Sequence, residues 1–472
     1  MSLEITEDLI ARQSPEAQVI IRILLAQVAE LKAEVAALRA ELATLKKTPH
    51  NSSLPPSTQH PHARPAVGKP KSNKSRGGQP GHPRHERALI PVSDCTQVVT
   101  LKPAACRRCG TALTGVDSHP LRHQVWELPE IKPLITEYQQ HRLACSSCGQ
   151  TTCAPLPPGV PHGQSGPRLI AFTATLMALF RQSKRRTALF VSSVLNIPCS
   201  PALTVKHQQL TTQALRPAYE ELACALPAQS HLNGDESPTK EGTTKAWLWT
   251  FVAQAFTVFA LRGSRAATAI SELLGETFAG VMSCDRAKMY WQCGRLQWCW
   301  AHLKRDFQAL VEHPDRQVQR LGRDLMRPTK ELFRQWARCR DGTITREELK
   351  LVLTPVREEV NALVLRGFYS GNARLTGMCR ELHEHREWLW TFLEVEGVEP
   401  TNNAAERSLR QAVIWRKLSF GTQSAAGSRF VETMLSAIET CRQQDRSVFE
   451  YVTTAVANHL TGQTCPSLLH RA

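Results

Sequence analysis

Apolar residues near the N-terminus recur at alternating steps of three and four positions from Ile21 onward, the spacing of a helix with one apolar seam. The a positions hold Ile21, Val28, Val35 and Leu42, and the d positions hold Leu24, Leu31, Leu38 and Leu45. β-branched residues at a with leucine at d favour a parallel two-stranded coiled coil. Glu34 falls five residues before Arg39, and the same spacing recurs one heptad on, as in ion pairs across a parallel dimer. The pattern predicts a homodimer joined through residues 1–48; one amphipathic helix packed on its own domain is the alternative.

The apolar pattern stops after Lys47, and residues 49–92 are rich in proline, glycine, serine and histidine. Such a composition cannot bury a core, so the segment is predicted to be a disordered linker. Between residues 61 and 90 the only acid is Glu86, against seven cations: Arg64, Lys69, Lys71, Lys74, Arg76, Arg84 and Arg87. A basic arm of this kind can neutralise phosphates without sequence preference. A solvated linker without a partner remains the other interpretation.

Helical periodicity returns in residues 161–227. The stretches "SKRRTALFVSSVL" and "PALTVKHQQLTTQAL" are separated by the turn "NIPCS", with Ser200 as the expected N-cap and Pro201 at the first helical position. These are the proportions of a helix-turn-helix, which predicts a DNA-binding region. Many helix pairs without any DNA contact have the same pattern.

From residue 228 the pattern changes to short apolar strands. A strand in "SHLNGDES" carries Asp235, the strands "KAWLWTFVAQ" and "FTVFALRG" follow, then a helical stretch, and then "GVMSCD" ends in Asp285. This order is the one found in ribonuclease-H-like folds, in which the first and fourth strands lie side by side. We therefore expect Asp235 and Asp285 to meet at one edge of a sheet.

The 472-residue chain is too long for one core, and its formal net charge of +16, with a pI near 9.4, favours a polyanionic partner. The longest apolar run, residues 169–180, is too short to span a membrane, which needs about 20 residues. The N-terminus is acidic, unlike a signal peptide, and the 15 cysteines are an odd number. These features predict a cytoplasmic, nucleoid-associated protein with reduced thiols, with double-stranded DNA rather than a membrane as partner.

Two C-x2-C pairs, each followed by glycine, lie in "CRRCG" and "CSSCG". Cys106, Cys109, Cys145 and Cys148 can place four thiolates around one Zn²⁺, which leaves no open position and predicts a structural site. The 35-residue gap is long, but the strand-like stretches 123–131 and 135–145 can fill it as a hairpin. A redox-active cysteine pair is the competing interpretation. Cys95 and Cys153 are expected to be bystanders.

A third acid, Glu406, begins a basic helix in "TNNAAERSLRQAVIWRK". Thr401 or Asn402 can cap this helix, which can pack on the predicted sheet and bring Glu406 beside the two aspartates. Three neighbouring carboxylates repel one another unless they bind divalent cations, so the set predicts a site for Mg²⁺ or Mn²⁺. Two such ions can activate a water or 3′-hydroxyl for phosphoryl displacement. A surface salt bridge from Glu406 to Arg410 is the plainer alternative.

Several sequence blocks together resemble the insertion-sequence 66 family of transposases. They are "DES" at 235–237, "CDRAKMY" at 284–290, "CWAHLKRDF" at 299–307, "NNAAERSLR" at 402–410, and "NSSLPPS" and "RGGQPGH" in the arm. The resemblance covers nearly the whole chain. It implies a DDE transposase with Asp235, Asp285 and Glu406 as the catalytic triad. Ser237 and Arg286 depart from the residues more common in the family, but neither change removes a ligand.

Basic residues beside these acids are expected to hold DNA phosphates. Four follow Glu406 on its helix: Arg407, Arg410, Arg416 and Lys417. His302 and Arg305 of "CWAHLKRDF" are further candidates for active-site or DNA contact, although they can equally form the polar face of a helix anchored by apolar neighbours.

The predicted fold is a multidomain α/β chain with a ribonuclease-H-like catalytic domain. Its parts are a coiled coil at 1–48, a basic linker at 49–92, a zinc ribbon-like module at 93–160, a helical DNA-binding region at 161–227, a catalytic domain at 228–306 and 398–472 ending in helices, and a helical insertion at 307–397. The predicted function is to bind the terminal inverted repeats of an insertion sequence, cleave there and transfer strands, with small accessory proteins as further possible partners. A zinc-dependent DNA-binding regulator without catalysis, or a metal-dependent nuclease without strand transfer, are the alternatives.

Overall fold

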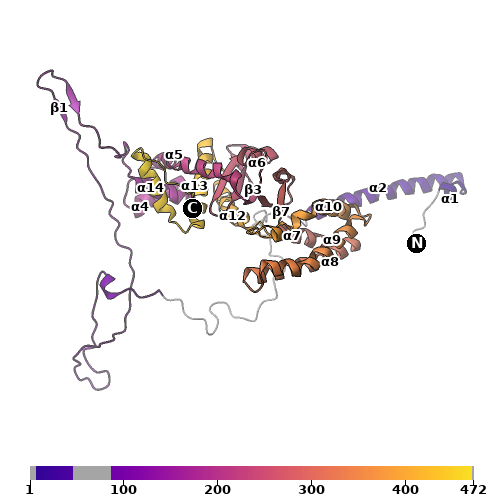
Figure 1. Cartoon of the computed structure of the whole chain (residues 1–472), viewed down its shortest axis with the longest axis horizontal. Helices are drawn as coiled ribbons and strands as arrows, with labels where there is room; N and C mark the ends of the chain where they lie inside the picture. Colours follow the sequence, from indigo (N-terminus) through magenta and orange to yellow (C-terminus); the bar gives the residue numbers. More distant parts are fainter. Residues whose placement is uncertain (1–6, 46–86, 470–472) are drawn as a thin grey trace. The chain divides into compact units, whose positions relative to one another are not determined.

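A computed structural model describes residues 7–45 and 87–469 of the chain (Figure 1). The predicted basic linker lies outside the described residues except for its last few positions. The chain divides into two compact units, one of residues 1–61 and 135–472 and the other of residues 62–134. Within the described chain, every helix is too short or too polar to cross a membrane.

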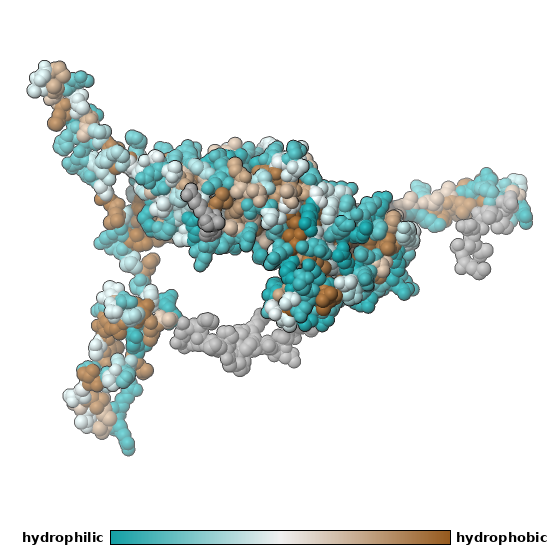
Figure 2. Space-filling view, in the orientation of Figure 1, coloured by the Kyte–Doolittle hydropathy of each residue, from teal (hydrophilic) through white to brown (hydrophobic). Residues whose placement is uncertain are grey.

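A 31-residue helix, α2 (Pro15–Leu45), follows the short α1 (Glu7–Ala11) and covers the predicted heptads. The apolar seam of α2 is open to solvent: the exposed fractions are 54% for Leu24, 58% for Leu31 and 57% for Leu38. Figure 2 shows such brown apolar residues along the helix. The side chains of Leu42 and Leu45 lie outside the description. An exposed apolar seam is the surface that a coiled-coil partner would cover.

The smaller unit holds the turn η2 (Val92–Asp94) and the first cysteine pair, closed by an antiparallel bridge between Ala105 and Ala112. The hairpin predicted over residues 123–145 is wrong, because residues 123–141 form no strand in the part of the chain that is described. Trp126 and Leu128 are 55% and 70% exposed, so this segment has no layer against which alternating side chains could be buried. In the other unit, β1 (Arg142–Ala144) instead pairs antiparallel with β2 (Thr151–Cys153).

Three helices follow: α3 (Pro167–Ala178), α4 (Lys184–Val194) and α5 (Pro201–Ala225). Ser200 caps α5 as predicted, because its hydroxyl accepts a hydrogen bond from the Leu203 N–H at 3.2 Å. The last two helices of the chain, α13 (Ala425–Gln443) and α14 (Val448–Leu460), pack against α5, and α14 also packs against α3. Helices from both sides of the sheet region in the sequence therefore share one core.

A five-stranded mixed sheet lies at the centre, in the order β5-β4-β3-β6-β7. Its strands are β3 (His231–Glu241), β4 (Thr244–Val252), β5 (Thr257–Arg262), β6 (Val281–Cys284) and β7 (Arg295–Trp298), with α6 (Ala267–Leu274) and the turns η3 (Leu226–Ala228) and η4 (Lys288–Cys293) between or beside them. β3, β4 and β5 are antiparallel, whereas β6 lies parallel to β3 and β7 parallel to β6. The first and fourth strands are thus neighbours, as the sequence predicts.

Both faces of the sheet are covered, because alternate residues of its strands enter two different apolar clusters. Trp249 and Phe251 of β4 belong to the larger cluster, which the α3, α5 and α14 helices share. Leu248 of β4 and Phe259 of β5 belong to a smaller one, completed by α13 and α12 (Asn403–Ser419). The acid-bearing strand β3 is therefore held between two packed layers.

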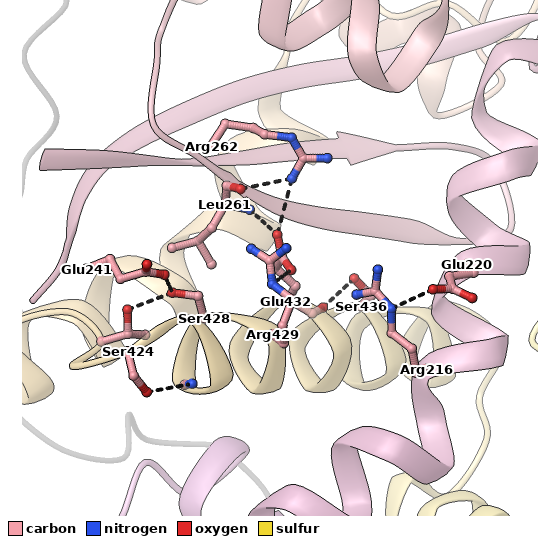
Figure 3. Close-up of polar contacts among 12 residues, drawn as sticks. Arg216, Glu220, Glu241, Leu261, Arg262, Ser424, Ser428, Arg429, Glu432 and Ser436 are labelled. Atoms are coloured by element: carbon pink, nitrogen blue, oxygen red, sulfur yellow. Dashed lines mark hydrogen bonds and ion pairs between the residues drawn. The ribbon is translucent and has the colours of Figure 1, made fainter. Parts of the chain in front are cut away.

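The edge strand β5 is closed by a helix. Three α13 side chains at four-residue intervals accept its outward N–H groups. Glu432 accepts from Leu261 at 2.5 Å (Figure 3). Ser436 accepts from Phe259 at 2.9 Å and Thr440 from Thr257 at 3.1 Å. Four helical residues rise about 6 Å, close to the length of about 6.7 Å for two strand residues. Every fourth side chain of α13 therefore comes level with every second residue of β5. We call these three side chains the α13 ladder.

Replacing Ser436 by Ala is expected to lower the free energy of unfolding by about 1–3 kcal/mol, because the buried Phe259 N–H loses its acceptor. Chemical denaturation measures the loss. Ser193→Ala on α4 is the matched control, because Ser193 is exposed and its hydroxyl only bonds back to the Leu189 carbonyl of its own helix. Equal stability of the two variants would contradict a structural role for the ladder.

The opposite edge, β7, is covered by the end of a helical insertion. The helix α7 (Trp300–Val311) leads into this insertion, which comprises α8 (Arg316–Arg340), α9 (Arg346–Phe368), α10 (Ala373–Glu384), η5 (Arg386–Leu389) and α11 (Thr391–Glu394), orange in Figure 1. The Thr391 hydroxyl donates to the Leu296 carbonyl at 2.5 Å, and the Phe392 N–H donates to the Gln297 side chain at 2.7 Å. The end of the insertion is therefore hydrogen-bonded to the edge of the sheet.

Candidate active site and metal-binding residues

The parallel pairing of β3 with β6 brings two of the predicted acids to the same level. His231 pairs with Val281 and Asn233 with Ser283, a constant offset of 50 residues. The same offset places Asp235 level with Asp285, one residue past the end of β6. Neighbouring strands lie about 4.8 Å apart, so both carboxylates stand at one place on the sheet.

The third acid, Glu406, stands in the first turn of α12, and Asn402 fixes where that helix starts. Asn402 occupies the N-cap position, but its side chain makes no capping bond. Its amide instead donates to the Gly234 carbonyl at 2.7 Å, next to Asp235, and its backbone N–H donates to the Cys299 sulfur at 3.2 Å. The start of α12 is thereby joined to the acid-bearing strand.

Gly234 keeps this junction tight. A Cβ at this position would come within 2.9 Å of the Met282 sulfur, closer than real Cβ atoms approach, and within 3.0 Å of the Tyr290 ring, which is unusually tight. A larger residue would have to push the Met282 and Tyr290 side chains aside. The glycine of "NGDES" is thus favoured by close side-chain packing beside the site.

The charges of Asp285 and Glu406 both act on the Asp235 carboxyl. The pKa of Asp235 is raised well above its usual range, chiefly by burial and then by the charges of Glu236, Asp285 and Glu406. A carboxyl whose ionised form is so disfavoured gains most from a nearby cation. Asp235, Asp285 and Glu406 offer hard oxygen donors only, the ligands that Mg²⁺ prefers, so the residues fit this ion.

A fourth acid, Glu236, belongs to the neighbourhood but has its own partners. It is buried, pairs with Arg265 at 2.5 Å and accepts a hydrogen bond from the Tyr290 hydroxyl at 2.6 Å. Burial and the Asp285 charge nevertheless raise the pKa of Glu236. Adjacent strand residues point to opposite faces, so Glu236 points away from the face that carries Asp235. Sequence analysis missed this residue, because its partners lie far along the chain.

The start of α7 meets Glu406 directly. Arg305 donates to a Glu406 carboxylate oxygen at 3.3 Å, and His302 Nδ1 lies 3.6 Å from the same oxygen. Burial lowers the pKa of His302, so its neutral form is favoured. The predicted role of these two residues at the site thus has a geometric basis, since both touch the third acid.

Cys299 joins His302 and Glu406 in a compact group whose ligand atoms lie within 4.8 Å of one another. Burial raises the pKa of the Cys299 thiol to about 11. The group mixes sulfur, nitrogen and oxygen donors, a set suited to a softer ion than Mg²⁺. Sequence reasoning did not identify it, because Cys299 and His302 form no spaced ligand motif with Glu406.

The basic residues of α12 fall into two kinds. Arg407, Arg410 and Lys417 are exposed, as phosphate contacts require. Arg416 is instead engaged with β3, donating to the Ser237 hydroxyl at 3.0 Å and to the Pro238 carbonyl. Arg416 therefore fastens α12 to the sheet. Arg286, the departure after the second acid, pairs with Asp306 and Glu381 at 2.8 and 2.9 Å, so its charge is compensated.

Each cysteine pair, taken by itself, forms the same kind of turn. The Cys106 N–H donates to the Thr111 carbonyl and the Gly110 N–H to the Cys106 carbonyl; the turn at Cys145, Gly149 and Gln150 has the same two bonds, all at 2.8–2.9 Å. The two glycines have φ values of +76° and +73°, which favour glycine.

Local hydrogen bonds favour thiolate at both turns. The pKa of Cys109 is lowered chiefly by the Thr111 hydroxyl, and that of Cys145 chiefly by the Cys148 N–H. Thiolate is the form that binds zinc, so the shifts at Cys109 and Cys145 are in the direction that metal binding requires.

Comparison with protein families gives two matches. A family model described as "Transposase IS66 family" matches residues 162–429, more than half of the chain. A second, described as "Family of unknown function (DUF6444)", matches residues 7–88. The first match spans all three acids.

Similar curated proteins come from Sinorhizobium fredii. Uncharacterized protein y4hP is 22% identical over 393 residues, 74% of this chain and 69% of its own length. Uncharacterized protein y4qI is 26% identical over 238 residues, 44% of this chain and 42% of its own length. Uncharacterized protein y4jO is 26% identical over 46% of this chain, and the match spans 64% of its own length.

Proposed function

The chain belongs to the IS66 family of transposases, and from that membership we propose that it is a DDE-type transposase. It binds the terminal inverted repeats of an insertion sequence, cuts a DNA strand at each end, and joins the freed 3′-hydroxyls to target DNA. The observation that supports the proposal is the register of β3 and β6, which puts Asp235 level with Asp285, together with the charge of Glu406 acting on Asp235. The strand order and directions support a ribonuclease-H-like catalytic domain.

The three carboxylates would hold a pair of Mg²⁺ ions, or Mn²⁺, which when bound supply activation of the attacking oxygen and stabilisation of the leaving one. Arg305 holds the Glu406 side chain in a fixed direction through a charge-assisted hydrogen bond. Asn402 holds the start of α12 against β3, and this fixes the position of the first turn, which carries Glu406. Neutral His302 beside Glu406 adds no positive charge to compete with a cation.

DNA would reach this site over exposed cations. Arg407, Arg410 and Lys417 of α12 are free to orient phosphates near the acids, whereas Arg416 positions the helix. Lys184, Arg185 and Arg186 begin α4 as an exposed basic group, which supports backbone contact by the helix-turn-helix-like region. The basic linker would add contacts without sequence preference. Cys106, Cys109, Cys145 and Cys148 would hold one structural zinc ion, which stabilises the fold of the part that recognises the element ends.

We also propose that α2 pairs with α2 of a second copy, because its apolar seam is exposed along much of its length. Removing residues 1–47 is expected to halve the molar mass in solution, measured by light scattering. Leu31→Glu should act likewise, since a charge on the seam of a coiled coil is costly, whereas Lys32→Glu on a flanking position should not. A monomeric full-length chain would contradict the pairing.

The function is tested with the purified full-length chain, duplex DNA carrying candidate element ends, and Mg²⁺ or Mn²⁺. Cutting at the element end followed by joining to a second duplex is the expected result. Cutting without joining would favour the nuclease alternative. Binding without cutting under either metal would favour the DNA-binding regulator.

A further inference from the structure

Helix α8 of the insertion carries a line of exposed cations that the proposed chemistry does not use. They are Arg316, Arg320, Arg323, Arg327, Lys330 and Arg334, all exposed. They follow one another at steps of three or four residues, so they stay within about 40° of one line along the helix. The line runs about 27 Å at 1.5 Å per residue. We call it the α8 basic stripe.

The stripe is the outer face of α8. The buried residues of the helix, including Leu321, Leu325 and Leu332, lie on the opposite side and pack against the rest of the insertion. The helix has eight basic and two acidic residues, whereas the neighbouring α9 has four of each. A solvated surface with no partner would need no such excess of positive charge, and the neighbouring α9 has no such excess.

Acidic residues neutralise only part of the stripe. Arg327 pairs with Glu359 of α9 and Arg334 with Glu331, both at 2.7 Å. Asp324, beside the stripe, is taken by Arg366 of α9. The other four cations of the stripe form no ion pair within the part of the chain that the structure describes.

A groove of about 720 Å³ lies beside the stripe. Four cations of the stripe line it, from Arg323 to Arg334, together with Gln308 and Val311 of α7. Its other lining residues are Met326, Pro328, Val356 and the acids Glu331 and Glu359, which pair with Arg334 and Arg327; none of them is aromatic. A groove that stacked single-stranded bases would need aromatic platforms, so this lining suits a sugar–phosphate backbone.

The groove opens close to the acids. Helix α7 packs on α8, and its first turns carry His302 and Arg305, which touch Glu406. Gln308 follows Arg305 by three residues, less than one helical turn or about 4.5 Å along the axis. A strand engaged at the acids would therefore pass near the groove within a few nucleotides.

We propose that the α8 basic stripe binds the phosphate backbone of duplex DNA that flanks the cleavage site. Five of its six members are arginines, whose planar guanidinium matches phosphate geometry. Its length covers several successive phosphates of one strand, which are spaced about 3.4 Å along the duplex axis. The large apolar side chains beside the stripe on α8, Met326 and Phe333, are partly buried against the core, so they are not presented to lipid as in a membrane-bound helix. This proposal depends on the proposed function only for the identity of the DNA that is bound.

The experiment measures the affinity of the full-length chain for a labelled end duplex over about 50–200 mM salt, where counterion release dominates. The test variant replaces Arg316, Arg320, Arg323 and Lys330 by Gln. The control variant, with the same loss of charge, replaces four exposed cations of the insertion off the stripe: Arg340, Arg374, Arg380 and Arg386. Thermal unfolding of both variants verifies that they are folded.

The test variant is expected to lose up to about 0.9 in log–log salt slope for each phosphate contact removed. If all four cations bind phosphates in the unmodified chain, the fall in affinity over that salt range becomes about a hundredfold smaller in the test variant. The control is expected to keep most of its slope. Equal salt slopes for the test and control variants would overturn the proposal. Polyglutamate, a polyanion without phosphates, is a second probe: a test variant that lost affinity for polyglutamate but not for DNA would also overturn it.

The outcomes separate the two proposals. If the unmodified chain cuts element ends while the test variant keeps the original slope, the stripe proposal fails and the transposase proposal stands. If the test variant loses slope but the unmodified chain never cuts, the transposase proposal fails and the stripe remains a DNA-binding surface.

Discussion

Glu406→Gln and Asp285→Asn are each expected to lower the rate of strand cleavage by more than about a hundredfold while leaving affinity for element ends nearly unchanged. Even the outer partners of metal ligands cost about 10–100-fold when removed, and these residues would be ligands themselves. Both substitutions keep size and hydrogen-bonding capacity but remove one negative charge. Single-turnover cleavage of a labelled duplex gives the rate, and a gel-shift titration gives the affinity.

Glu358→Gln is the matched control, because Glu358 is exposed on α9, away from the acids. The site also offers a second readout without DNA. Asp285→Asn removes one of the charges that raise the pKa of Asp235, so that pKa should fall toward its usual range in metal-free protein. Carboxyl NMR measures the change. Cleavage at the unmodified rate by both site variants would contradict the assignment of the three acids as a catalytic triad.

Cys145→Ser is expected to reduce bound zinc from one ion to none per chain, and Cys106→Ser to do the same. One zinc shared by both pairs predicts that a single substitution in either suffices. Structural zinc contributes about 10–16 kcal/mol in small zinc domains, so its loss should unfold the local turns and weaken end binding. Elemental analysis gives the metal content, and limited proteolysis reports the unfolding.

Cys153→Ser is the control, since Cys153 is exposed on β2 just beyond the second turn and is not a predicted ligand. Full zinc content in the Cys106 and Cys145 variants would contradict the site. Loss of half the zinc in each would instead mean that the two pairs bind separate ions.

Local pattern was enough to predict much of this fold. The heptads predicted α2, Ser200 and Pro201 marked the start of α5, and the order of acids and strands predicted that β3 lies beside β6. Each of these depends on residues close in sequence or on a known strand order. The same local reasoning predicted strands at residues 123–131, where alternation is present but no packing layer exists.

The contacts that position the site were not predictable in this way. Asn402 reads locally as an N-cap, yet its side chain bonds to Gly234, 168 residues earlier. Arg416 reads as a phosphate ligand, yet it donates to Ser237. Whether such a side chain serves the helix, the solvent or a distant strand depends on which element packs over it, and periodicity carries no information about that.

The α13 ladder has a consequence for how copies of this protein can assemble. Helix side chains bond three outward N–H groups of β5, and the Thr391 segment covers part of β7, so a visiting strand would have to displace these contacts. Copies of the protein gathered on paired DNA ends are therefore expected to contact one another through surfaces other than the β5 edge, which disfavours strand pairing between their catalytic domains.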